Sequence, residues 1–121
     1  MDDLSKFGKF IVQNLRDRAI EQHLMMQSGR FRGARAQALQ SRLATMKPED
    51  RETVRELMED AIDTALHDLL FALQDSHDRS LGIEVLVNGE NVAERSGALQ
   101  SEPLGDEGWI ARFSRFATRA H

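Results

Sequence analysis

The sequence predicts an α+β fold that is mostly α: three N-terminal helices, the third of them the longest, then a β-hairpin and a C-terminal helix. Apolar residues recur at helical spacing over most of residues 4–76. Around residues 83–94 the apolar spacing changes to the alternation of a β-strand. Because no internal repeat divides the 121 residues, we expect a single α-rich domain spanning residues 1–121.

The first predicted helix runs from about Leu4 to Gln27. Asp2 or Asp3 can cap its start, and Gly29 suits the position just beyond its end. Its apolar face is formed by seven residues at helical spacing: Leu4, Phe7, Gly8, Ile11, Val12, Leu15 and Ala19. After a loop with two glycines, a second helix is expected over about residues 34–46.

The third predicted helix spans about residues 48–76. Pro48 suits a first helical position, and the acidic residues that follow it favour the positive end of the helix dipole. The pattern predicts a wide buried stripe on this helix: Val54, Met58, Ala61, Ile62, Ala65, Leu66, Leu69, Ala72 and Leu73.

A β-hairpin is predicted from about Ile83–Val87 and Asn91–Glu94. The dipeptide Asn88-Gly89 between them suits a two-residue turn in which both residues have positive φ. An isolated hairpin is marginally stable in water, so we expect it to lie on the helices. The last helix is predicted over about residues 107–120.

The charges are arranged in blocks. Residues 49–78 hold ten acids and two bases, a local net charge of −8, whereas residues 28–48 hold five bases and no acid. The chain as a whole carries a net charge of −4, which argues against nucleic acid as a partner. The acidic block can instead attract a basic protein.

We expect the protein to be cytoplasmic, with no membrane association. The chain has no cysteine, and its acidic start lacks the basic and apolar parts of a signal peptide. Its apolar runs fall well short of the roughly 20 residues that span a bilayer.

Two features of the third helix concern polar residues. Asp63 and His67 are four residues apart, on the face opposite the predicted apolar stripe. Asp68 falls at the margin of that stripe, as Arg18 does on the first helix. A partly buried carboxylate needs a partner, so we predict a structural ion pair between Arg18 and Asp68.

Catalytic motifs are missing from the sequence. There is no Gly-rich phosphate loop, no cysteine nucleophile, no Gly-x-Ser-x-Gly and no His-Glu-x-x-His. We therefore predict no catalytic residue, no metal ligand and no cofactor. The alternative left open is a small metal-dependent hydrolase that uses His67 with Asp63, Asp68 and His23, because a histidine oriented by a carboxylate is the minimum unit of such sites.

Residues 61–94, AIDTALHDLLFALQDSHDRSLGIEVLVNGENVAE, resemble a stretch of small stand-alone bacterial proteins of unassigned function. In size and acidity the chain is similar to immunity proteins that neutralise bacterial toxins. The resemblance implies a binding role and brings no catalytic residue with it.

The leading hypothesis is thus a non-catalytic protein-binding module, such as an immunity protein that masks a basic toxin surface. The predicted partner-binding residues all lie on the outer face of the third helix: Glu56, Glu59, Asp60, Asp63 and His67. A further hypothesis is a homodimer that hides an apolar face around Leu70 and Phe71.

Overall fold

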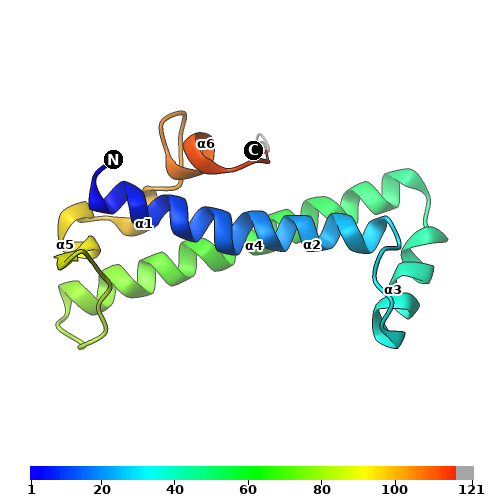
Figure 1. Ribbon diagram of the computed structural model, residues 1–121, viewed down its shortest axis with the longest axis horizontal. Coiled ribbons are helices and arrows are strands. Elements are labelled where there is room, and N and C mark those ends of the chain that lie inside the picture. Colours follow the sequence, from blue (N-terminus) through cyan, green and yellow to red (C-terminus); the bar gives the residue numbers. More distant parts are fainter. Residues whose placement is uncertain (117–121) are drawn as a thin grey trace.

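Two long helical segments form the frame of the molecule (Figure 1). The computed structural model describes residues 1–116. The first segment is continuous and consists of α1 (Asp3–Ile11), η1 (Val12–Arg16) and α2 (Asp17–Gln27). The chain turns through α3 (Ala34–Ala44) and returns along α4 (Pro48–Asp78), antiparallel to the first segment. The three predicted N-terminal helices are confirmed, and α4 is the longest.

The predicted ends of the first helix are also confirmed. The side chain of Asp2 accepts a hydrogen bond from the Ser5 N–H at 2.8 Å. At the other end Gly29 has a φ of +74°, the left-handed conformation that glycine adopts without strain.

The segment η1 is a π-helical turn that the sequence pattern did not reveal. A π turn holds more residues than an α turn, so it rotates the part of the helix that follows it. Beyond it, Ile20 is fully buried, whereas Ala19 of the predicted face is only half-buried. The same turn buries Arg16 and Asp17, each 1% exposed.

The predicted stripe on α4 is wrong in its orientation. Ala61, Ala65, Leu69 and Ala72 are exposed. The residues that α4 buries are Glu59, Leu66, Leu70, Gln74 and Ser76. The packed face is therefore rotated by roughly a third of a turn from the most apolar face. Leu70, predicted to point away from the core, is fully buried, whereas Phe71 is exposed.

The orientation of α4 follows from the elements that pack against it, which include the α1–α2 segment, the short 3₁₀ helix η2 (Leu99–Ser101) and α5 (Val92–Ser96). Gln74 is buried because it lies in the contact between α4 and η2, where its side-chain oxygen accepts the Leu99 N–H at 3.0 Å. Burial of a polar side chain is tolerated where such a bond is made.

The predicted hairpin is present but short. Strands β1 (Leu86–Val87) and β2 (Glu90–Asn91) pair antiparallel, with Leu86 opposite Asn91. Asn88 and Gly89 have φ values of 51° and 83°, as the predicted turn requires. The Asn88 side chain donates to Asp3 at 2.9 Å, so the hairpin lies on α1 as expected.

The second predicted strand was wrong beyond Asn91. There the chain enters α5 (Val92–Ser96), because the Asn91 side chain accepts the N–H groups of Ala93 and Glu94 and caps a helix. The last helix is also shorter than predicted. α6 spans Trp109–Phe113 and ends at Ser114, whose backbone is extended; residues 117–120 of the predicted helix lie outside the described part of the chain.

The core lies where α1, α4, α5 and α6 meet. Trp109 is 1% exposed, and its ring lies edge-on to Phe7 with the ring centroids 5.9 Å apart. A Cβ atom at Gly8 would lie 2.5 Å from the Trp109 indole, so Gly8 makes room for that ring. Within residues 1–116, no helix combines the length and apolar character needed to cross a bilayer.

Candidate functional site

The five residues predicted to bind a partner do not form one solvent-facing surface. Glu59 is 4% exposed and accepts a hydrogen bond from Arg55 Nε at 3.1 Å. Asp63 is half-buried and accepts from Arg16 Nε at 2.7 Å. Glu56, Asp60 and His67 lie on the exposed side of α4. The rotation of α4 therefore turns two of the predicted acids toward the chain's own arginines.

The predicted pair of Arg18 and Asp68 is replaced by Arg16 and Asp63. The π turn places Arg16 toward α4 and leaves Arg18 exposed. The Asp68 side chain is 72% exposed, and its carboxylate lies 3.2 Å from Nδ1 of His67. Arg16 and Asp63 thus form an ion pair that joins the first helical segment to α4.

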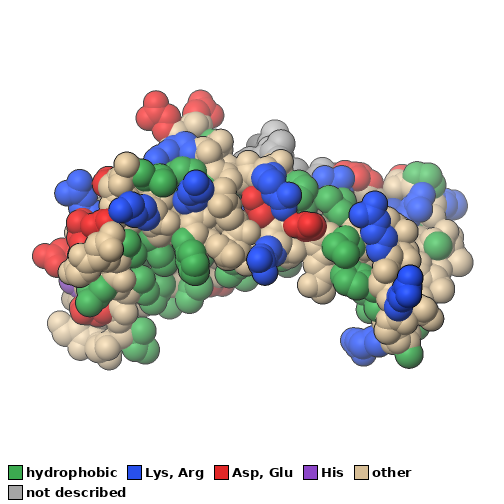
Figure 2. All heavy atoms as spheres, in the orientation of Figure 1, with side chains coloured by type: hydrophobic (Ala, Val, Ile, Leu, Met, Phe, Trp, Pro, Cys, Tyr) green, Lys and Arg blue, Asp and Glu red, His purple; other side chains and the backbone are tan. Residues whose placement is uncertain are grey.

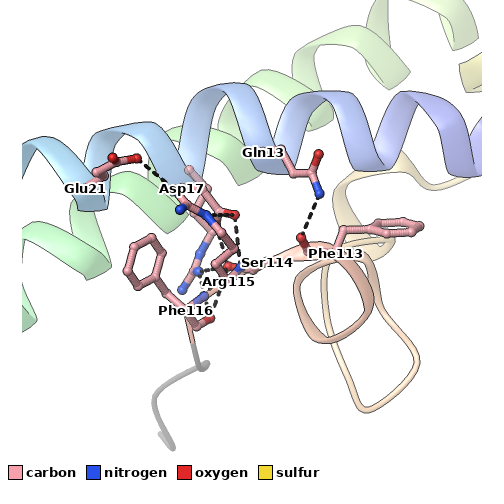
Figure 3. A network of polar contacts seen from close by, with 8 residues as sticks. Gln13, Asp17, Glu21, Phe113, Ser114, Arg115 and Phe116 are labelled. Atoms are coloured by element: carbon pink, nitrogen blue, oxygen red, sulfur yellow. Dashed lines mark hydrogen bonds and ion pairs between the residues drawn. The ribbon is translucent and has the colours of Figure 1, made fainter.

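Arg16 and Asp17 hold the segment that follows α6 (Figure 3). Arg16 Nη1 donates to the Ser114 hydroxyl at 3.0 Å and to the Phe116 carbonyl at 3.3 Å. The buried carboxylate of Asp17 accepts the Ser114 hydroxyl at 2.5 Å and the Arg115 N–H at 3.0 Å. Two adjacent residues of the first segment thereby fix residues 114–116 against that segment.

A pocket of about 310 Å³ lies between α4 and the loop that carries η2 and leads into α6. Its walls are mainly apolar, from Leu66, Pro103, Leu104, Ile110 and Ala111. Its polar lining residues are Asp63, His67, Gln100 and Asp106. The pocket brings together Asp63 and His67, which were predicted, with a loop that the sequence analysis did not connect to them.

The polar groups of the pocket are rich in acceptors. Asp63 and Asp106 supply two carboxylates, and Asp63 keeps acceptor capacity beyond its bond from Arg16 because a carboxylate can accept several hydrogen bonds. The side-chain oxygen of Gln100 is buried and makes no hydrogen bond to any part of residues 1–116. A buried polar atom of this kind is stabilised by a donor.

His67 lies at the rim of this pocket. Its ring stacks on Phe71, with the ring centroids 6.4 Å apart and the planes within 13° of parallel. Its contact with Asp68, rather than with Asp63 as the spacing suggested, follows from the bond that Asp63 makes to Arg16.

His23 lies elsewhere, on α2 near Arg55 and Glu59. Burial lowers the pKa of His23 from its ordinary value, the positive charge of Arg55 lowers it further, and Glu59 opposes them. The hydrolase alternative grouped His23 with Asp63, His67 and Asp68. Nowhere in residues 1–116 do three His, Asp or Glu side chains converge as metal ligands would.

No protein-family model matches the chain, and searches of curated proteins and of solved structures found no match either. The geometry of the pocket and its lining residues therefore carry the functional proposal.

Proposed function

We propose that this chain is a non-catalytic protein-binding module that takes a Lys or Arg side chain of a basic partner into the pocket between α4 and the 99–111 loop. The carrying observation is the combination in one pocket of apolar walls and two carboxylates, those of Asp63 and Asp106. Lys and Arg have an apolar stem and a head that only donates hydrogen bonds, so they complement both parts of the pocket.

The surroundings of the pocket support the same kind of partner. Leu104 is 64% exposed at its edge, and a large apolar side chain in that position can pack on a docked surface. The acids Asp60, Asp68 and Glu107 are also exposed on α4 and the adjoining loop. Such charges speed the approach of a basic protein, and this attraction becomes weaker as the salt concentration rises. The sequence led us to expect a toxin with a basic surface as the partner. Such a surface would supply Lys and Arg side chains, since a protein surface that binds phosphate groups is basic.

The binding experiment uses a displayed library of random peptides, selected on the wild-type protein and counter-selected on a Leu104→Arg, Asp106→Lys variant. We expect the enriched peptides to contain more Lys and Arg than the library. The variant should bind them at least ~10-fold more weakly, because one buried charged contact is worth about 1.5–3 kcal/mol.

The matched control is Leu81→Arg, Glu84→Lys, which makes the same chemical change just beyond the end of α4, at exposed positions outside the pocket. Both pairs of positions are exposed, so both variants should keep the wild-type circular dichroism. The proposal predicts little change in peptide affinity for the control. Peptides without an excess of bases, or a larger loss in the control than in the pocket variant, would contradict it.

A further inference from the structure

A second surface of α4 is only partly covered by residues 1–116: Met58, Ile62 and Leu73 are half-buried, and Leu73 packs against the core. This apolar flank consists of Met58, Ala61, Ile62, Ala65, Leu69, Ala72 and Leu73. Ala61, Ala65, Leu69 and Ala72 are exposed, and Leu69 retains 42% of its surface. Hydrophobic side chains gather along the lower edge of the molecule, where α4 passes beneath α1 (Figure 2). Residues three and four apart in this arrangement are typical of a helix–helix contact.

The flank is complementary to itself when two copies run antiparallel. If Ala65 meets Ala65 of a second copy, then Met58 faces Ala72 and Ala61 faces Leu69. In these two pairs a large side chain meets a small one, which allows close packing, while Ile62 faces Asp68 and Leu73 faces Leu57 at the margins of the contact. A parallel arrangement would place Leu69 on Leu69 and alanine on alanine, so it would leave unequal gaps.

The charges also favour the antiparallel arrangement. At the α3 end of the molecule, residues 28–48 carry five bases and no acid. At the opposite end of α4, residues 75–94 carry five acids and one base, a net charge of −4. The first turns of α4 at the α3 end, residues 49–60, add six acids and two bases, so residues 28–60 have a net charge of +1. An antiparallel pair therefore separates the two acidic ends, which a parallel pair would bring together.

The exposed area is large enough for such an interface. The chain exposes 7,880 Å², whereas a compact monomer of this mass would expose about 6,600 Å². The excess of roughly 1,300 Å² belongs to the whole elongated chain, and a stable interface of standard size takes ~800 Å² from each partner, so this shape leaves room for one.

From these observations we propose that the chain forms an antiparallel homodimer through the apolar flank of α4, with Ala65 at the twofold axis. The pocket proposed above opens on the opposite side of α4, because Asp63 and His67 lie about half a turn from Ala61 and Ala65. The dimer therefore presents two pockets and does not depend on the proposed function.

The mass in solution, measured by light scattering, tests the dimer. The wild-type chain should have twice the monomer mass of 13.7 kDa, and Ala65→Glu should reduce it to the monomer value. The matched control is Thr64→Glu, at the neighbouring exposed position outside the flank, which should remain a dimer. A monomeric wild-type protein, or an Ala65→Glu variant that remains a dimer, would overturn the proposal.

Cysteine cross-linking tests the arrangement without a destabilising charge, since the natural chain has no cysteine. A mixture of the Met58→Cys and Ala72→Cys variants should form a covalent heterodimer with a short bismaleimide reagent. Met58→Cys alone should not cross-link, because its antiparallel partner position is 72. Efficient cross-linking of Met58→Cys alone would show a parallel pair and overturn the antiparallel one.

Discussion

Arg16 Nε donates a hydrogen bond to the Asp63 carboxylate at 2.7 Å and joins the π-helical turn of the first segment to the middle of α4. Arg16 is 1% exposed and Asp63 29% exposed, so the pair lies at the boundary of the core. The same guanidinium binds the segment that follows α6. One arginine thus connects three parts of the chain that are far apart in sequence.

Replacing Arg16 by Met should lower the free energy of unfolding by about 2–3 kcal/mol. The loss is expected to be smaller than for a fully buried pair because water can solvate part of Asp63. Urea unfolding measures this loss in the free energy of unfolding. The control is Arg18→Met, which removes an exposed arginine two residues away and should cost less than ~0.5 kcal/mol. An equal loss from both substitutions would contradict the role assigned to Arg16.

Gly8→Ala should lower the free energy of unfolding by about 1–3 kcal/mol, because the added methyl group would overlap the Trp109 ring. Fluorescence reports the change directly, since Trp109 is the single tryptophan of the chain. In a Trp109→Phe background, where unfolding is followed by circular dichroism, the smaller ring leaves more room, so the same substitution should cost less. If Gly8→Ala lowers the free energy of unfolding equally in both backgrounds, the effect comes from the helix backbone and not from contact with residue 109.

His23 should make stability depend on pH. Burial, then Arg55, lowers the pKa of His23 below its value of 6.5 in an unfolded chain, so the unfolded state takes up the proton first. The contribution of His23 to stability is complete above pH 6.5 and decreases as the pH falls from there toward the pKa of the folded state. Urea midpoints at several pH values should therefore drop less for His23→Gln than for the wild type. If the urea midpoint of the His23→Gln variant depends on pH as that of the wild type does, the prediction is contradicted.

Asn91→Ala should destabilise α5 by about 1 kcal/mol, because it removes the acceptor for the Ala93 and Glu94 N–H groups. Amide hydrogen exchange of residues 92–96 is the suitable measurement, since the effect is local. Asn91→Asp keeps an acceptor oxygen and should preserve protection. If both variants exchange alike, the cap contributes little.

Local features could be predicted from the sequence because their causes are local. The helices follow from apolar spacing, the Asp2 cap from one side chain beside its own helix, and the Asn88-Gly89 turn from two residues that tolerate positive φ. Asn91 shows the limit of that reasoning. Its alternating neighbourhood predicts a strand, but its side chain satisfies two N–H groups better by starting a helix.

The candidate site was only half predictable. Asp63 and His67 were singled out from their spacing, and both line the pocket. The partners predicted for them, and for Asp68, were wrong because the wheel of an ideal helix cannot show the π turn that moves Arg16 into contact with Asp63. The opposite wall of the pocket comes from residues more than 30 positions later, and no local pattern connects them to α4.

The sequence by itself determined where the three N-terminal helices begin and end, which dipeptide makes the turn, and how charge is distributed along the chain, because each depends on neighbours a few residues apart. Only the tertiary structure decided which side of α4 is packed. Burying Leu66, Leu70 and Gln74 against the first segment and η2 outweighed burying the more apolar flank around Ala65. That choice depends on contacts between distant segments, and it is what leaves one face of the helix beside a pocket and another uncovered.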